Sequence, residues 1–325
     1  MFDGLPAGLR DLAARQCGIL TATQLVEAGV RKDVPAYRVA QGRWQRPFRG
    51  VCATFSGELD REALLWAAVL RAGPGAMLSH QSAAELARLT DEPSTQIHVT
   101  IPVQRRIAPI RGVVLHRRAD ADQARHPVLL PPQTRVEETV LDLAGAARTL
   151  DGAVGWVTRG LGRRLTTAGK LRDALGSRAR MRWRAELTEL LSPEFAGVLS
   201  PLEYRYHRDV ERPHGLPAGT RQARFLAGSR TGYRDRSYDA YLTVVELDGN
   251  LAHTADERWR DIRRDNAAAA GGLITLRYGW LDVTKHPCQV AAEVAAALAA
   301  RGFAGATSCG PGCPVSHASS ALRSA

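Results

Sequence analysis

The chain has 325 residues, a formal net charge of +11 and a hydrophobic content of 45%. That length allows two or three domains with sizeable cores, and that hydrophobic content excludes wholesale disorder. No apolar run approaches the roughly 20 residues of a membrane span, and the N-terminus lacks the basic and apolar regions of a signal peptide. We therefore expect a cytoplasmic protein with no membrane partner.

Nearly all the basic residues are arginine. Of 44 Arg and Lys residues, only Lys32, Lys170 and Lys285 are lysines. Arginine binds phosphate through two nitrogens and stacks on bases, so this balance favours DNA as a partner. A composition rich in Ala and Arg is also typical of a GC-rich genome, which weakens the inference.

The five cysteines are odd in number and scattered along the chain: Cys17, Cys52, Cys288, Cys309 and Cys313. The last two, with the nearby His317, could hold zinc. Reduced thiols are the simpler interpretation, because no second pair of cysteines lies close in the sequence.

Residues 5–55 predict a winged helix–turn–helix. Helical apolar spacing runs from Leu9 to Cys17, Thr21 is suited to cap a helix that reaches Ala28, and Val34 to Gln41 is a third candidate helix. Residues 49–54 would form the wing hairpin. In such a domain the third helix enters the major groove, which would place Lys32, Arg38 and Arg43 near phosphates or base edges. A winged helix that docks another protein is the alternative.

This region resembles the N-terminal domain of AbiEi-type antitoxins of type IV toxin–antitoxin systems. The similarity lies in Gly-x-Leu-Thr-x-x-Gln-Leu-x-x-Ala-Gly-Val from Gly18, then Arg-Val-x-x-Gly-Arg-Trp from Arg38, and Arg49-Gly50-Val51. It covers about fifty residues and implies binding to promoter DNA. It also implies a possible partner, a toxin nucleotidyltransferase encoded nearby.

Residues 58–155 predict a middle α/β segment. Helices are expected at 62–71, 82–89 and 136–147, and strands at 96–101 and 112–116. Its order also resembles the remainder of the antitoxin architecture. His80, His98 and His116 are far apart in the sequence, and each is expected to be an ordinary histidine rather than a ligand.

A basic helical linker is expected at 156–199. Between Arg159 and Arg184 there are nine Arg or Lys residues and one acid, Asp173. Such a run can follow a DNA backbone with Trp183 in support, or it can be a solvated helix face. Ser192-Pro193 and Ser200-Pro201 mark a boundary at its end.

The C-terminal part, 200–303, is expected to hold the chemistry, with a disordered tail at 304–325. Ser200-Pro201-Leu202-Glu203 has the pattern of a capping box, which would give Glu203 a purely structural role. A strand at 221–226, a hairpin at 237–249, a helix at 257–270, a strand at 273–278 and a helix at 287–301 follow. The predicted fold class is therefore a multidomain α+β chain.

The hairpin gathers acidic residues. If Leu242-Thr243 is a two-residue loop, Asp239 faces Glu246, with Cβ atoms roughly 4.5–5.5 Å apart. Asp248 follows Glu246 by two positions and points to the same face. Like charges this close repel, and Mg²⁺ or Mn²⁺ would remove the conflict. A different turn would direct the acids apart into solvent.

The C-terminal order resembles the restriction-endonuclease-like (PD-(D/E)XK) fold, in the branch related to the very short patch repair endonuclease. The matching residues are Ser200-Pro201-Leu202-Glu203, Tyr238-Asp239, Val245-Glu246-Leu247-Asp248-Gly249, His253, Arg260-Asp261-x-x-Arg264, Gly271 and Leu276-Arg277-Tyr278-Gly279-Trp280. The resemblance covers roughly a hundred residues.

This resemblance implies roles for individual residues. Asp239 would be the principal metal ligand, Glu246 and Asp248 would flank the metal, and Glu203 would reach in from the first helix. His253 would orient or deprotonate the attacking water, with Asp261 and Arg264 as weaker candidates for phosphate contacts. The general pattern has Lys where this chain has Asp248, so the site could be inactive, although the repair branch also lacks that lysine.

Three hypotheses follow. The first is a DNA-binding protein with a metal-dependent endonuclease domain that hydrolyses phosphodiester bonds. The second is an antitoxin-type transcriptional regulator whose nuclease-like domain is inactive. The third is a protein-interaction module with a basic surface. The corresponding domains are 1–57, 58–155, 156–199, 200–303 and 304–325.

Overall fold

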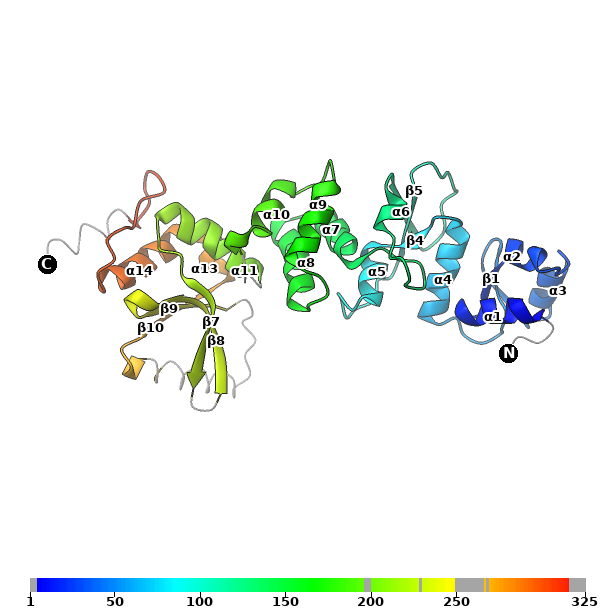
Figure 1. The fold of residues 1–325 in the computed structure, drawn as a ribbon, viewed down its shortest axis with the longest axis horizontal. Coiled ribbons are helices and arrows are strands. Elements are labelled where there is room, and N and C mark those ends of the chain that lie inside the picture. The colour runs from blue at the N-terminus through cyan, green and yellow to red at the C-terminus, as the bar shows by residue number, and fades with distance from the viewer. Residues whose placement is uncertain (1–4, 196–199, 228–229, 249–265, 267–268, 316–325) are drawn as a thin grey trace. The chain divides into compact units, whose positions relative to one another are not determined.

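The computed structural model describes residues 5–195, 200–227, 230–248, 266 and 269–315 (Figure 1). Helices and small sheets of both strand orientations alternate along it, so the α+β class is confirmed. The chain forms two compact units, one of residues 1–148 and 160–184 and the other of residues 149–159 and 185–325. Among the described residues, no helix has both the length and the apolar character needed to span a membrane.

The N-terminal part of the first unit has helices where the sequence predicted them, but its hairpin begins at Gln45 and not at residue 49. In chain order they are α1 (Ala7–Arg15), β1 (Ile19–Thr21), α2 (Ala22–Glu27), α3 (Val34–Ala40), β2 (Gln45–Phe48) and β3 (Val51–Ala53). The three strands form one sheet in the order β1-β3-β2. Thr21 caps α2 as predicted, since its Oγ1 accepts from Gln24 N at 3.1 Å and Gln24 Oε1 accepts from Thr21 N at 2.8 Å.

The rest of the first unit is a small sheet covered by helices. Its elements are α4 (Arg61–Ala72), β4 (Met77–Leu78), α5 (His80–Leu86), β5 (Ile97–Pro102), β6 (Val113–Arg118), α6 (Ala121–Ala124), α7 (Val136–Ala146) and α9 (Ala168–Ser177). β5 lies between β4 and β6, antiparallel to the first and parallel to the second. Ile19 and Val51 of the N-terminal sheet share a core with Trp66 of α4, so the core crosses the boundary predicted at residue 57.

The basic segment is not one continuous charged face. It is divided among α8 (Leu150–Gly162), α9 and α10 (Arg184–Leu190), and the two compact units separate within it. Arg178 is half-buried and donates to Glu138 and Asp142, the latter at 2.8 Å. Arg163 pairs with Asp91. These guanidiniums are held by protein acids, because folding brings distant carboxylates against them, and they cannot all follow a DNA backbone.

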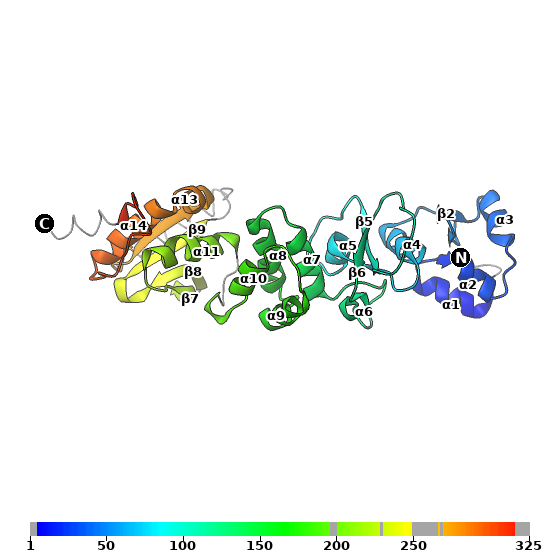
Figure 2. The same ribbon diagram turned by 90° about the horizontal axis from the view of Figure 1, so that it is seen from above.

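The second unit is a four-stranded sheet with helices packed on one face (Figures 1 and 2). Its strands are β7 (Thr220–Ala227), β8 (Arg230–Tyr238), β9 (Thr243–Asp248) and β10 (Ile274–Gly279), in the order β10-β9-β8-β7. Of the strand pairs in the described part of this sheet, β9 and β10 run parallel and the other two pairs run antiparallel. Its helical elements are η1 (Pro193–Phe195), α11 (Pro201–Arg205), η2 (Tyr206–Glu211), η3 (Arg212–His214), η4 (Asp239–Tyr241), α13 (Trp280–Lys285) and α14 (Pro287–Ala299).

Its core lies between the sheet and these helices. Val245 and Leu247 of β9 pack with Tyr206 of η2 and with Val290 and Val294 of α14. Apolar surface removed from water at about 25 cal/mol per Å² is the main force that holds the layers together. The inward face of β9 is thereby set by its odd-numbered residues.

A buried ion pair joins the helical layer to β8. Arg236 is 1% exposed, and its Nε lies 3.1 Å from Oε1 of Glu211, whose side chain is 2% exposed. Tyr238 donates to the same oxygen at 2.8 Å, and His207 contacts Oε2 at 2.6 Å. Burial would raise the pKa of Glu211, but His207, Arg236 and Tyr238 together hold it below its usual value. Glu211 is therefore charged in the folded protein.

The segment after α14 is folded, contrary to the prediction of a disordered tail from residue 304. Cys313 and Val315 are buried in the core of the second unit, and Thr307 N donates to His214 O at 2.9 Å. Its Gly and Ser content suggested disorder, but the few apolar residues within it pack against that core. Residues 316–325 lie outside the described part of the chain.

Replacing Arg236 by Met should destabilise the second unit by about 3–5 kcal/mol, because Glu211 would keep a buried charge without its guanidinium partner. Hydrogen exchange of β8 and β9 amides would report this loss locally. Arg224→Met, at an exposed position of the neighbouring strand β7, is the matched control and should leave exchange unchanged. Equal exchange in both variants would contradict the role of the pair.

Candidate functional site

Glu246 and Asp248 lie on one face of β9, as the alternation predicted. Val245 and Leu247 are buried in the core, whereas Glu246 and Asp248 are both partly exposed. Successive side chains of a strand point to opposite faces, so the two acids share the face away from the packed helices. They form one edge of the candidate site.

The predicted pairing of Asp239 with Glu246 is wrong. The β8–β9 ladder pairs Tyr238 with Thr243 and Arg236 with Val245. One further step in this register places Asp235 opposite Glu246. Oδ2 of Asp235 accepts from Leu247 N at 2.8 Å, which fixes the carboxylate against β9. Asp239 instead lies exposed in the turn and accepts a hydrogen bond from Ser237.

The error came from the length of the turn. A two-residue hairpin loop of the common types needs a positive φ at one or both central residues, which Leu-Thr disfavours. The chain uses a longer turn, with η4 over Asp239–Tyr241 and a left-handed Leu242 at φ 46°. This shifts the register by four residues. Because four is an even number, the residue opposite Glu246 still points to the same face of the sheet. That residue is Asp235 in place of Asp239.

Glu203 reaches this group from α11. Ser200 caps the helix by accepting from Glu203 N at 3.1 Å, as predicted. The side chain of Glu203 faces the sheet, because Gln222 Nε2 lies 3.4 Å from its Oε1 and 3.1 Å from Asp235 Oδ1. One amide thus bridges two carboxylates, and sequence reasoning missed both Gln222 and Asp235.

The fourth side of the group is basic. Arg277 of β10 is paired in register with Glu246, and its Nη1 lies 3.3 Å from Asp248 Oδ2. Burial raises the pKa of Asp235, and the nearby Asp248 adds to the rise, although hydrogen bonds from Leu247 N and Gln222 oppose it. A cation beside Asp235 would reverse this effect by favouring its charged form.

The spacing of these carboxylates suits an ion that keeps several waters better than an ion bound entirely by protein oxygens. Among the described residues, these carboxylates do not gather three ligand oxygens as tightly as a preformed ion site does. Mg²⁺ is usually bound through one or two carboxylates while it keeps several waters. Asp235 and Glu246 fit that ligand set, with Asp248 and Glu203 close by.

The other predicted residues are less fully described. His253, Asp261 and Arg264 lie outside the described residues. Lys32 and Arg43 are exposed on either side of α3, and Arg38 on that helix is half-buried. Tyr37, which the sequence did not single out, is 61% exposed on the same helix and adds an aromatic surface beside these cations.

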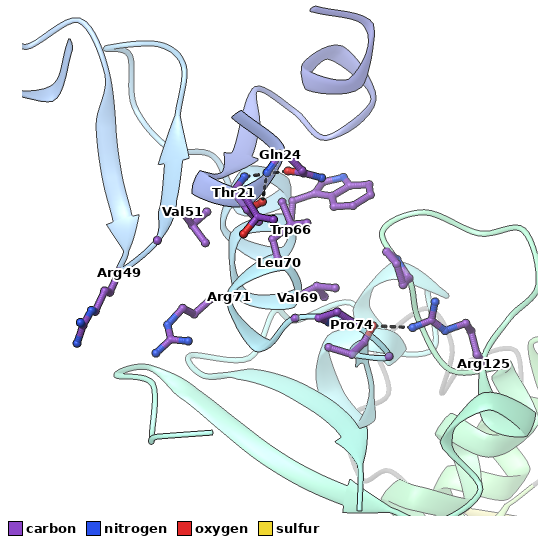
Figure 3. A pocket seen from close by; sticks show the side chains of 16 residues that line it. Thr21, Gln24, Arg49, Val51, Trp66, Val69, Leu70, Arg71, Pro74 and Arg125 are labelled. Carbon is purple, nitrogen blue, oxygen red and sulfur yellow. Dashed lines mark hydrogen bonds between the residues drawn. The ribbon is translucent and has the colours of Figure 1, made fainter. Parts of the chain in front are cut away.

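A pocket of about 540 Å³ lies in the first unit, between the start of α2, α4 and the loop after it (Figure 3). Trp66, Val69 and Leu70 give it an apolar wall, and Arg49 and Arg71 lie along its rim. Arg125 is engaged with Ala76 O at 2.9 Å. All of its lining residues belong to the first unit, and the pocket is not part of the acidic group.

Three histidines that the sequence treated singly come together in the first unit. His80 and His116 stack with ring centroids 3.6 Å apart, and His98 Nδ1 lies 3.0 Å from His116 Nε2. Burial lowers the pKa of His80 to about 3 and that of His116 to about 4, with neighbouring imidazoles adding to both effects. Burial also lowers the pKa of His98. The three rings are therefore neutral at pH 7, and their nitrogens, within 4.8 Å of one another, could bind a transition metal.

Comparisons with known proteins identify no family. No family model matches the chain, and no curated protein matches it. Among solved structures, a similar chain is that in "Crystal structure of RV2827C protein from Mycobacterium tuberculosis". It has 18% sequence identity and a TM-score of 0.39, and the match covers 62% of this chain and 80% of that one.

The histidine group should make the first unit sensitive to acid. An unfolded histidine takes up a proton near pH 6.5, whereas the folded rings resist protonation until pH 3–4. The free energy of unfolding should thus be independent of pH well above 6.5 and fall by roughly 2–4 kcal/mol by pH 5 as the two rings contribute together. Hydrogen exchange of β5 and β6 amides, with chelator present, would measure this fall.

The variant His80→Gln/His116→Gln should show a flatter pH dependence than wild type. His126→Gln, a histidine of the same unit outside the group, should keep the wild-type dependence. Identical slopes in all three proteins would show that the group does not set acid stability.

Proposed function

We propose that the chain is a DNA-binding protein whose second unit is a metal-dependent endonuclease domain of the restriction-endonuclease-like class. The observation that carries the proposal is the β8–β9 register, with Asp235 opposite Glu246 and Asp248 on the same face. Acids grouped this way on adjacent strands, with a glutamate from the preceding helix, can hold Mg²⁺ or Mn²⁺ at a scissile phosphate.

Asp235 and Glu246 would hold the ion, with Asp248 beside them. A divalent ion so bound supplies a Lewis acid and a water of lowered pKa for phosphodiester hydrolysis. Glu203 lies within reach of Asp235 through Gln222 and can accept a proton from a nearby water. His253, outside the described residues, is a second candidate for orienting that water.

Arg277 can supply the positive charge that the lysine of the general pattern provides and that this chain lacks on β9. Asp248 occupies the lysine position, but the guanidinium of Arg277 lies beside it at 3.3 Å and next to Glu246 in register. A fixed positive charge there can pair with a phosphate oxygen as negative charge develops. The neighbouring strand would thus supply the charge that β9 lacks.

The N-terminal 55 residues are proposed to act as a winged helix–turn–helix that binds DNA. Support comes from the helix order, the sheet β1-β3-β2 and the exposed side chains of Lys32, Tyr37 and Arg43 around α3. An antitoxin-type regulator with an inactive second unit is the alternative, and Asp248 in place of lysine is the feature that favours it.

Asp235→Asn should reduce Mn²⁺-dependent nicking of plasmid DNA by roughly 100-fold or more, because loss of a ligand exceeds the 10–100-fold effect of losing an outer partner. Asn still accepts the hydrogen bond from Leu247 N, so the fold should be kept. Asp239→Asn removes the same charge from the turn and should retain nicking. Intact plasmid with wild type and metal, across several substrates, would favour the inactive regulator.

Arg43→Gln should weaken DNA binding and reduce the slope of log affinity against log salt by about 0.9 if its guanidinium neutralises one phosphate. Arg10→Gln, an equal charge change at an exposed position of α1, is the control and should leave the slope as in wild type. Fluorescence anisotropy over a salt series measures both. Equal slopes in wild type and Arg43→Gln would exclude this residue from the DNA interface.

A further inference from the structure

Three cysteines and a histidine converge in the second unit, away from the acidic residues of β8 and β9 in the sequence. His214 ends η3, Cys288 lies in the first turn of α14, and Cys309 and Cys313 bracket the turn Gly310-Pro311-Gly312. One ligand atom from each of the four lies within 4.8 Å of all the others.

These distances are those of ligands around one ion. A tetrahedral zinc with sulfur ligands at ~2.3 Å holds those sulfurs about 3.8 Å apart. Cys288 Sγ and Cys309 Sγ are 3.5 Å apart, whereas a disulfide would bring them to about 2.05 Å. None of the five cysteines, all within the described residues, forms a disulfide. The space between the ligand atoms is too small for a multi-iron cluster.

His214 is oriented as a ligand. Its side chain is 1% exposed, and its Nδ1 donates to Val210 O at 2.8 Å, which leaves the proton off Nε2. Nε2 is buried and has no hydrogen-bond partner. A buried acceptor without a partner costs free energy, and a metal ion bound to the lone pair of Nε2 would remove that cost. Metal-bound histidines commonly donate their other nitrogen to a backbone carbonyl in this way.

The backbone brings the ligands together over a long sequence distance. Gly215 is left-handed at φ 61°, and Thr307 N donates to His214 O at 2.9 Å, so the segment after α14 lies against the end of η3. Cys313 is buried, and Val315, two residues on, is 0% exposed in the core. The segment has few other apolar residues that could hold it in place.

We propose that His214 Nε2 and the thiolates of Cys288, Cys309 and Cys313 bind one zinc ion. Four protein ligands close the coordination sphere, which is the pattern of a structural site, whereas catalytic zinc keeps an open position. The ion ties the segment after α14 to η3 and to the start of α14. It is separate from the ion proposed for the acidic group and differs from it in chemistry, with soft ligands in place of carboxylates.

Metal analysis of the untagged full-length protein tests this site. Wild type should carry one zinc per chain, and Cys309→Ser and Cys313→Ser should each lose most of it. Cys17→Ser, a half-buried cysteine of the first unit, is the matched control and should keep full zinc content. Cobalt substitution of wild type should give the thiolate charge-transfer absorption of a tetrahedral site, and Cys309→Ser should weaken it.

If the cysteine variants do not fold, wild type alone decides the matter. Chelation should expose three additional reactive thiols and speed hydrogen exchange at 303–315, and added zinc should reverse both changes. Zinc content below one tenth per chain, iron in place of zinc, or a Cys288–Cys309 disulfide in the freshly purified protein would overturn the proposal. None of these measurements depends on DNA cleavage, so they are independent of the proposed nuclease activity.

Discussion

The side chain of Arg236 points into the core of the second unit, where its Nε lies 3.1 Å from Oε1 of the buried Glu211 and the two form an ion pair. A buried guanidinium cannot turn to the other face of its strand without leaving Glu211 unpaired, at a cost of several kcal/mol. Because side chains alternate along β8, this inward residue forces its neighbour Asp235 outward. The candidate site therefore rests on a pair that takes no part in its chemistry.

The same interaction links the helices to the acids. Glu211 belongs to η2, which continues directly from α11, and α11 carries Glu203. The pair thus fixes how the first helix lies on the sheet, and Gln222 then joins Glu203 to Asp235 across the strands. The proposed zinc ligands His214, Cys288, Cys309 and Cys313 begin three residues after Glu211. A zinc ion bound there would hold the same short helical segment a second time.

The local sequence pattern predicted most of the helices and strands. The wrong or missing predictions concern contacts between residues that are distant in the sequence. Glu246 and Asp248 share one face of β9 because side chains alternate along a strand with a period of two, and this holds for any pairing register. The register itself depends on the turn, and the sequence Leu242-Thr243 does not predict a left-handed backbone conformation at Leu242. Asp235 could have been found by testing a four-residue loop, 239–242, which pairs Tyr238 with Thr243. His214 and Cys288 could not be found this way, because only the folded chain brings them to Cys309.

Everything proposed for the second unit depends on Asp235, and not Asp239, sharing a divalent ion with Glu246. Electron paramagnetic resonance of Mn²⁺ titrated into wild type, Asp235→Asn and Asp239→Asn tests it without DNA. Wild type and Asp239→Asn should each bind one Mn²⁺ at the acidic group, and Asp235→Asn should bind it at least about 10-fold more weakly. Weak binding in Asp239→Asn with full binding in Asp235→Asn would contradict it.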